Sequence, residues 1–129
     1  MTQIIEPRLS FQVTGVCFKV HNKLGRFCSE RQYCDELEAE FLKANLMFVR
    51  EYELSKIPGV DRKGNRVDFL IAKIIVLDVK AKKFVTKDDY TQMLRYLEGA
   101  NLQLGMIVNF RSTYLKPKRV INNKYKLQV

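Results

Sequence analysis

Two aspartates and a lysine, Asp68, Asp78 and Lys80, lie in the most β-like part of the sequence, residues 66–81. The residues around them are mainly apolar and β-branched, which is typical of strands buried on at least one face. A short hairpin turn centred on Lys73 would set Asp68 directly opposite Asp78, with their Cβ atoms roughly 5 Å apart. Because side chains two apart in a strand point the same way, Lys80 would lie beside Asp78. The spacing predicts two carboxylates and one ammonium group at one place.

Two carboxylates at such a distance repel each other, and both stay ionised only if a cation lies between them. A hard divalent ion such as Mg²⁺, or Mn²⁺ in its place, prefers these oxygen ligands and keeps several waters. A water acidified by the ion and held by Lys80 would attack a phosphodiester phosphorus, while the ion offsets charge on the phosphoryl oxygens. Lys80 could instead contact those oxygens as a fixed positive charge, and both roles stay open. The pattern favours metal-assisted phosphodiester hydrolysis.

The same residues also have an interpretation without chemistry. An Asp-x-Lys segment in a strand is commonly a solvated ion pair. A register shift of one residue would turn Asp68 to the other face of the sheet. The register of the hairpin therefore decides between the two interpretations.

Two amphipathic helices are predicted before the hairpin. Gly25 is placed to end the first helix as a left-handed cap. Ser29 and Gln32 form a Ser-x-x-Gln capping box that begins the second helix, which runs to about Asn45. The apolar stripes are Val13, Val16, Cys17, Val20 and Leu24 in the first helix, and Tyr33, Cys34, Leu37, Phe41 and Ala44 in the second.

A strand and two turns are predicted between the second helix and the hairpin. Residues 47–54 mix aromatic and β-branched residues with charged ones, as in a half-exposed strand. Turns with glycine or proline follow at residues 58–59 and 63–65.

A third helix and a further strand follow the hairpin. Thr86 is placed as an N-cap with Asp89 three residues later, and Gly99 is placed to end this helix. Residues 103–110 form an apolar strand. The order helix, helix, three strands, helix and strand predicts an α/β fold with a mixed sheet flanked by helices.

The chain has 129 residues, of which 47% are hydrophobic and 29% charged, with six glycines and three prolines. This composition predicts one domain over residues 1–129 and argues against disorder, collagen and a two-domain enzyme. Twenty-three basic residues against fourteen acidic ones leave a net charge of +9, which suits a polyanionic partner. Segment 111–129 contains basic residues and no acidic ones, so it is either a solubilising tail or a nucleic-acid contact.

Three cysteines without a regular framework fit the reducing cytoplasm better than a secreted disulfide scaffold. The N-terminus carries an acid and a proline where a signal peptide needs an apolar run, and no segment approaches 18 apolar residues. We therefore expect a cytoplasmic protein without a membrane partner. A zinc site of Cys17, His21, Cys28 and Cys34 is an alternative, but it lacks the close cysteine pair of structural zinc sites, which favours packed thiols.

Three strings resemble the core motifs of the PD-(D/E)XK nuclease superfamily: Asp68, the tripeptide Asp78-Val79-Lys80, and the helical Gln92-Met93-Leu94-Arg95-Tyr96. The Gln-x-x-x-Tyr element is similar to that of the RecB-like branch. Most of the chain more closely resembles the GxxExxY protein family within that superfamily. The stretches that carry this resemblance are residues 20–25, 30–33, 67–71, 77–81, 92–97 and 104–110.

The resemblance implies a restriction-endonuclease-like α/β core. It also implies that Asp68, Asp78 and the backbone carbonyl of Val79 bind the metal ion, and that Lys80 is the catalytic lysine. Glu30 would match the family's helical glutamate and complete the coordination directly or through water.

The resemblance adds secondary site residues and shows two departures. Gln92 would match the family's helix glutamine, and Tyr96 lies one turn later on the same face, so both would orient substrate or ligands. His21 matches a family position and is a secondary candidate for a metal ligand. Phe27 replaces the glycine that gives the family its name, and Asp78 replaces the more usual glutamate. Neither change removes a required functional group.

Basic residues near the predicted site are candidates for phosphate contacts, which fix the register of a nucleic acid without reading its bases. They are Lys82, Lys83, Lys87 and Arg95, and an ordinary charged surface is the alternative. Tyr114 and Tyr125 are interleaved with basic residues and could stack on bases. We expect them instead to pack a terminal strand against the sheet.

The leading hypothesis is a Mg²⁺-dependent nuclease that hydrolyses phosphodiester bonds of nucleic acid, DNA more than RNA, with Glu30, Asp68, Asp78 and Lys80 at its centre. A homodimer is compatible with this hypothesis, because many members of the superfamily act as dimers. The competing hypothesis is a non-catalytic nucleic-acid-binding or assembly module that retains the nuclease fold. A protein-binding adaptor without affinity for nucleic acid ranks last.

Overall fold

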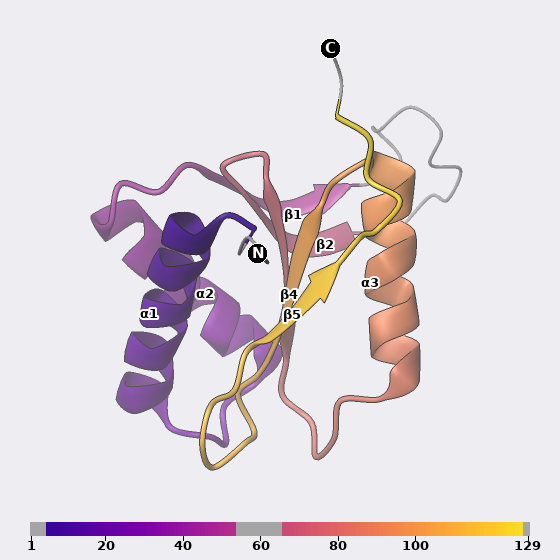
Figure 1. The fold of residues 1–129 in the computed structure, drawn as a ribbon. Helices are drawn as coiled ribbons and strands as arrows, with labels where there is room; N and C mark the ends of the chain where they lie inside the picture. Colours follow the sequence, from indigo (N-terminus) through magenta and orange to yellow (C-terminus); the bar gives the residue numbers. More distant parts are fainter. Residues whose placement is uncertain (1–4, 54–65, 128–129) are drawn as a thin grey trace.

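A computed structural model describes residues 5–53 and 66–127, so Leu54 and the turns predicted at 58–59 and 63–65 lie outside the described residues. In this part of the chain five strands form one mixed sheet in the order β1-β2-β3-β4-β5, and three helices flank it (Figure 1). The predicted α/β architecture is confirmed, as is the order of the elements up to β4.

The first helix, α1 (Pro7–Leu24), begins before the apolar stripe from which it was predicted. Pro7 fits the first turn, where the N–H that proline lacks has no partner within the helix. Gly25 ends the helix with φ 75° and ψ −158°, a positive φ that favours glycine but lies outside the left-handed helical region. The Gly25 N–H donates to the His21 carbonyl oxygen over 2.8 Å.

The second helix, α2 (Glu30–Lys43), begins with the predicted capping box. The Gln32 N–H donates to Ser29 Oγ over 3.2 Å, and Gln32 Oε1 accepts from the Ser29 N–H over 2.8 Å. The helix ends at Lys43 instead of Asn45, which already has a left-handed φ of 56°. The capping box fixes where this helix starts, and that start adjoins the site described below.

The predicted hairpin consists of β2 (Arg66–Ile71) and β3 (Ile75–Lys80). Ala72 and Lys73 have φ values of 53° and 60°, and the Ile74 N–H closes the turn with a 2.9 Å hydrogen bond. Two successive positive φ angles are typical of a primed turn, which Asn-Gly adopts with less strain. The register, centred on Lys73 as predicted, pairs Phe69 with Leu77, Leu70 with Val76 and Ile71 with Ile75.

The third helix, α3 (Lys87–Ala100), connects β3 to β4 (Leu104–Asn109), and these two strands are parallel. Its predicted N-cap is present, because the Asp89 N–H donates to Thr86 Oγ1 and Asp89 Oδ2 accepts from the Thr86 N–H. This connection places the start of α3 next to the end of β3.

The end of α3 differs from the prediction. The helix continues past Gly99, and Asn101 provides the left-handed cap with φ 50° and ψ 52°. Asparagine tolerates this conformation, and so the glycine is not needed as the stop signal. Further on, Gly105 allows α3 to approach β4, because a Cβ there would collide with the Met93 side chain.

Two edge strands complete the sheet. β1 (Phe48–Glu53) pairs antiparallel with β2, and β5 (Lys118–Ile121) pairs antiparallel with β4. β5 was not predicted as an element, because only one of its four residues, Val120, is buried. The expectation that Tyr114 packs the terminal strand against the sheet is wrong, because this side chain is 79% exposed.

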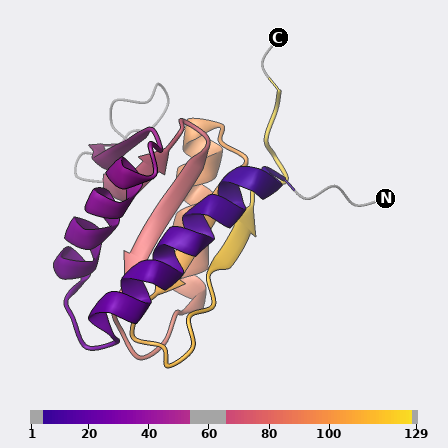
Figure 2. The same ribbon diagram turned by 90° about the vertical axis from the view of Figure 1, so that its left-hand side faces the viewer.

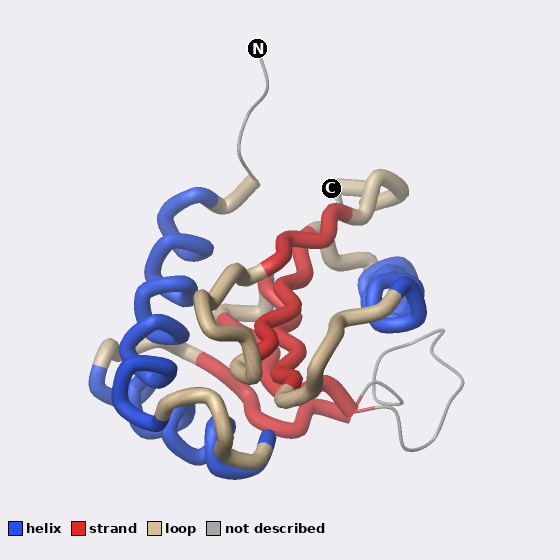
Figure 3. Tube along the Cα trace, turned by 90° about the horizontal axis from the view of Figure 1, so that it is seen from below, coloured by secondary structure: helices blue, strands red, loops and turns tan. Residues whose placement is uncertain are grey.

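The sheet lies between two helical layers, with α1 and α2 on one face and α3 on the other (Figures 2 and 3). Alternate residues of β3 divide between the two interfaces. Ile75, Leu77 and Val79 pack toward α1 and α2, whereas Val76 packs toward α3. No helix in the described residues combines the length and the apolarity needed to cross a membrane.

Candidate active site

The two aspartates lie at the open end of the β2–β3 hairpin. Continuing the register one residue beyond Phe69 and Leu77 sets Asp68 opposite Asp78. The paired ladder stops there, and the Val79 N–H donates to Asp68 Oδ2 over 2.6 Å. The carboxylate thus occupies the gap between the separating strands, where it accepts a hydrogen bond that a strand carbonyl would otherwise accept.

Asp78 and Lys80 lie on the face that α3 covers. Leu77 and Val79 pack toward the other two helices, so strand alternation turns their neighbours toward α3. Asp78 Oδ2 lies 3.2 Å from Lys80 Nζ, and Asp89 Oδ1 of α3 lies 3.9 Å from the same nitrogen. The structure therefore brings Asp78 and Lys80 together as their spacing predicted.

Asp68 lies at a change in the alternation of β2. Val67 packs toward α3 and Phe69 toward the opposite helices, although residues two apart in a regular strand share a face. The Asp68 side chain lines a cavity beside α2, while its charge also acts on Tyr96 of α3. The site therefore spans the end of the sheet, which differs from the expectation that both carboxylates share one face.

The electrostatics of the site reflect crowded carboxylates. Burial raises the pKa of Asp68 to about 7, the Val79 N–H opposes this rise, and the charges of Asp78 and Glu30 add to it. Burial alone lowers the pKa of Lys80, but the acidic neighbours led by Asp78 raise it by more, so the net shift is upward. A cation beside Asp68 and Asp78 would relieve their repulsion.

The loop before α2 is anchored by Tyr33. Its hydroxyl donates to the Gly25 carbonyl oxygen over 2.6 Å and accepts from the Cys28 N–H over 3.2 Å. Its ring stacks on Phe110, just after β4, with 4.3 Å between the ring centroids. These contacts tie the start of α2 to the sheet.

Glu30, the first residue of α2, is exposed. Its charge raises the pKa of both Asp68 and Lys80, although it is not the largest contributor to either shift. The predicted helical glutamate therefore lies near enough to act on the other two groups.

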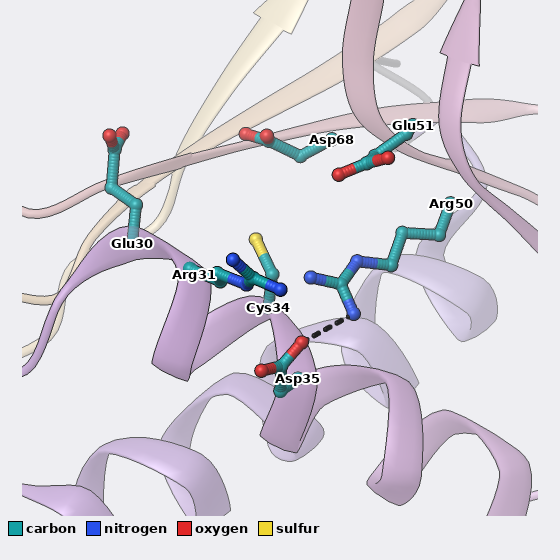
Figure 4. A pocket seen from close by; sticks show the side chains of 7 residues that line it. All are labelled: Glu30, Arg31, Cys34, Asp35, Arg50, Glu51 and Asp68. Atoms are coloured by element: carbon teal, nitrogen blue, oxygen red, sulfur yellow. Dashed lines mark ion pairs between the residues drawn. The ribbon is translucent and has the colours of Figure 1, made fainter.

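A cleft of about 600 Å³ opens beside Asp68 (Figure 4). In the figure, the carboxylates of Asp68 and Glu51 extend from the sheet, opposite side chains that rise from α2. Arg50 forms ion pairs with Asp35 at 2.7 Å and with Glu38 at 2.8 Å, so most of its charge is neutralised. The lining residues are Glu30, Arg31, Cys34, Asp35, Arg50, Glu51 and Asp68.

Sequence reasoning did not single out Glu51. The β1–β2 ladder pairs Arg50 and Tyr52 but leaves Glu51 out, at the position opposite Asp68. Its φ of 54° is unusual for a residue other than glycine within a strand. No sequence signal distinguished Glu51 from an ordinary charged residue on a half-exposed strand.

Lys82 is held by an internal ion pair that the sequence did not reveal. Its Nζ lies 2.6 Å from Asp89 Oδ2, the oxygen that also accepts from the Thr86 N–H. Burial raises the pKa of Asp89, but Lys82, Thr86 and Lys80 lower it by more. A phosphate contact by Lys82 would compete with this pair. The capping position of Asp89 was predicted, whereas its contact with the lysines was not.

Asn109 fixes the chain that follows Lys80, and it too was missed as a positioning residue. Its Nδ2 donates to the Lys82 carbonyl oxygen over 2.7 Å, and its Oδ1 accepts from the Lys82 N–H over 3.1 Å. The same Oδ1 accepts from the Arg111 N–H over 3.3 Å. A polar residue that ends an apolar strand was the only signal available.

The other predicted substrate contacts lie on and around α3. Tyr96 lies within range of the carboxylates. Burial is the main cause that raises the pKa of its hydroxyl, and the charge of Asp78 raises this pKa further. Gln92 and Arg95 line a separate hollow of about 300 Å³, on an exposed part of the helix. Lys87 is exposed at the start of α3. Lys83 borders a groove described below.

His21 interacts with the chain after β4. Its Nε2 lies 3.0 Å from the Ser112 carbonyl oxygen, and its ring lies 6.2 Å from that of Phe110. Cys17 is buried in the core, and burial raises its pKa to about 12. In the described residues neither His21 nor the cysteines belong to a group of three potential ligands, so these contacts lend no support to a zinc site.

The donor set at the open end of the hairpin fits a magnesium-like ion. No three Asp, Glu, His or Cys side chains in the described ranges are grouped closely enough to hold a metal by themselves. Mg²⁺ is commonly bound through one or two carboxylates and takes its other ligands from water and substrate phosphate. Asp68 and Asp78 provide that number of carboxylates.

One of three comparisons with known proteins finds a family for the chain. A family model described as the PD-(D/E)XK nuclease superfamily matches residues 7–121, which include both aspartates and Lys80. No curated protein and no solved structure matches the chain. Proteins of this superfamily are generally nucleases, act on nucleic acid and typically use divalent metals. Since the match covers most of the sequence, from α1 to β5, the chain belongs to the PD-(D/E)XK nuclease superfamily.

Proposed function

We propose that this protein is a metal-dependent nuclease that hydrolyses phosphodiester bonds of nucleic acid, DNA more than RNA. The observation that carries the proposal is the convergence of Asp68, Asp78 and Lys80 where the hairpin opens. The net charge of +9 supports a polyanionic substrate.

Asp68 and Asp78, with the backbone carbonyl of Val79, would hold Mg²⁺, or Mn²⁺ in its place. A bound divalent ion would supply an acidified water and offset charge on the phosphoryl oxygens. Glu30 would complete the coordination directly or through water, which fits the effect of its charge on Asp68 and Lys80.

Lys80 would provide the positive charge of the site. Its ammonium group would hold the attacking water or contact the non-bridging phosphate oxygens, and Asp78, 3.2 Å away, keeps it at the open end of the hairpin. Tyr96 and Gln92 would orient the substrate from α3. The phosphate contacts would come from Lys82, Lys83, Lys87 and Arg95.

We also propose a finer placement within the superfamily, as a RecB-like member of the GxxExxY type. The Gln-x-x-x-Tyr spacing on α3 and the helical Glu30 support it. Residues 1–129 would form one domain that includes the basic segment 111–129, since β5 of that segment pairs with β4. Cys17, Cys28 and Cys34 are free thiols, which suits a cytoplasmic protein, and a homodimer would suit the superfamily.

The two departures from the family pattern favour a second candidate, a nucleic-acid-binding or assembly module without catalysis. Phe27 stands in place of the family's glycine, and Asp78 stands in place of the more usual glutamate. This candidate predicts salt-dependent binding of nucleic acid that neither Mg²⁺ nor the Asp78→Asn substitution changes.

The proposal is tested by incubating the protein with single-stranded DNA, duplex DNA and RNA in Mg²⁺, Mn²⁺ or EDTA. Cleavage should require the metal and should fall to background in Lys80→Ala. Lys43→Ala, which removes an exposed lysine from the last turn of α2, the end of the helix away from Glu30, should cleave like the wild type. Metal-dependent cleavage that persists in Lys80→Ala would defeat the assignment, and binding without cleavage would select the second candidate.

A further inference from the structure

A groove of about 300 Å³ lies between the segment that follows β3 and the segment that follows β4. Its volume is at the lower end of that of small-ligand pockets. Two aromatic rings and three lysines line it, with no aspartate or glutamate: Lys83, Phe84, Tyr114, Lys116 and Lys118. The groove therefore combines aromatic surface with uncompensated positive charge.

Both aromatic rings are unusually open to solvent. Phe84 is 76% exposed and Tyr114 is 79% exposed. A single exposed apolar residue is ordinary on a protein surface, but two aromatic side chains on one groove form a potential stacking surface. Phe27 is a useful contrast, because Arg26 and Arg111 already lie 5.0 Å and 5.1 Å from the centre of its ring. Among the described residues, no arginine or lysine covers Phe84 or Tyr114 in this way.

The lysines of the groove also lack internal partners. Lys83, Lys116 and Lys118 form no ion pair with any acidic side chain in the described part of the chain. Lys82 differs, because Asp89 neutralises it at 2.6 Å. The charge of the groove is therefore complementary to phosphate.

The groove adjoins the candidate active site. Lys83 follows Lys80 by three residues, a stretch of chain that spans at most about 11 Å. Asn109 lines the groove and binds the backbone of Lys82 through both ends of its side-chain amide. Figures 1 and 2 show the loops after β3 and β4 at the same end of the molecule. One nucleic-acid strand could therefore contact both places.

We propose that this groove binds an unpaired stretch of nucleic acid, with bases stacked on Phe84 and Tyr114 and phosphates near the three lysines. Base faces become available for stacking only where the strand is unpaired. The inference rests on the proposed nuclease function and narrows its substrate class to single strands or to duplexes with a single-stranded part.

The test measures binding without cleavage, in EDTA, by fluorescence anisotropy of labelled oligothymidylate and of a blunt duplex of equal length. The wild type should bind the single strand more tightly than the duplex. Phe84→Leu and Tyr114→Leu should each weaken single-strand binding roughly tenfold, as expected for the loss of one stacked base, and should change duplex binding little. Phe11→Leu is the matched control, since Phe11 is 79% exposed on α1.

The outcomes separate this inference from the proposed function. Single-strand binding that both leucine variants retain, or equal affinity for the blunt duplex, would overturn the stacking groove even if metal-dependent cleavage is observed. Single-strand binding that depends on Phe84 and Tyr114, in a protein that cleaves under none of the conditions tested, would support the groove and refute the proposed nuclease function. Unchanged thermal unfolding of the leucine variants confirms that lost affinity does not reflect lost folding.

Discussion

The two ends of the β2–β3 hairpin are built in opposite ways. At the closed end, apolar side chains face each other in regular register, as in the pair Ile71 and Ile75, and the three turn residues 72–74 join the strands. At the open end, the ladder stops and Asp68 accepts the Val79 N–H with its carboxylate. The same pair of strands thus contributes core packing at one end and concentrates charge at the other.

This difference indicates that the two ends of the hairpin have different roles. Leu77 is fully buried, whereas its neighbour Asp78 keeps 16% of its side-chain surface exposed next to Lys80. Crowded carboxylates destabilise the folded chain unless a cation binds between them or one of them is protonated. We therefore expect substitutions at the open end to change activity, and substitutions at the closed end to change stability.

The largest effect should come from Asp78→Asn. Removing one carboxylate should lower the rate of metal-dependent cleavage about a thousandfold or more, because the loss of the ion removes several kcal/mol of transition-state stabilisation. The free energy of unfolding measured in EDTA should change little, because relief of the repulsion with Asp68 offsets the loss of the ion pair with Lys80. A variant that cleaves normally would show that Asp78 is not a ligand.

At the closed end, Ile75→Ala should lower the free energy of unfolding by about 2–5 kcal/mol, the usual cost of removing a fully buried isoleucine side chain. Urea unfolding followed by circular dichroism measures this change. Under conditions where the variant is folded, its cleavage rate per folded molecule should stay within a few-fold of the wild type. A selective loss of activity with full stability would contradict the division between the two ends.

The pH dependence of stability should sharpen the comparison. The pKa of Asp68 is raised from 3.8 to about 7 in the folded chain, so between these values the folded state binds a proton that the unfolded state has released. In EDTA, stability should therefore fall by about 2–3 kcal/mol as the pH rises from 5 to 7, and level off above that. Asp68→Asn should remove this slope while its amide oxygen still accepts the Val79 N–H. Mg²⁺ should stabilise the wild type more at pH 8 than at pH 5.

The smallest effect concerns the turn. Ala72→Asn combined with Lys73→Gly places the preferred residues at two positive φ angles, which should raise the free energy of unfolding by about 1 kcal/mol. Thermal unfolding at constant pH measures the gain. Cleavage should be unchanged, because the turn is at the far end of the hairpin. A stability loss would argue against the primed turn.

Much of the fold could be predicted because its signals are local. The capping boxes at Ser29 and Thr86 need only residues three apart, and the hairpin register needs only a turn and an apolar pattern. β5 could not be predicted in this way, because its pairing with β4 determines it and Val120 is its only buried residue.

The site was predictable where strand spacing alone determines proximity, as for Asp78 and Lys80. Contacts between distant elements were not predictable. The pairing of Lys82 with Asp89 and the position of Glu51 opposite Asp68 depend on how α3 and β1 pack against the hairpin. The exposure of Tyr114 likewise depends on the path of the chain between β4 and β5.

The most direct test of the central claim is a crystal structure of the protein soaked in Mn²⁺, examined by anomalous scattering. We predict one peak between the carboxylates of Asp68 and Asp78, within reach of the Lys80 ammonium group, and its loss in Asp68→Asn. A well-ordered hairpin with no peak at the two carboxylates would contradict the proposed metal site. So would a Mn²⁺ peak located elsewhere in place of that one.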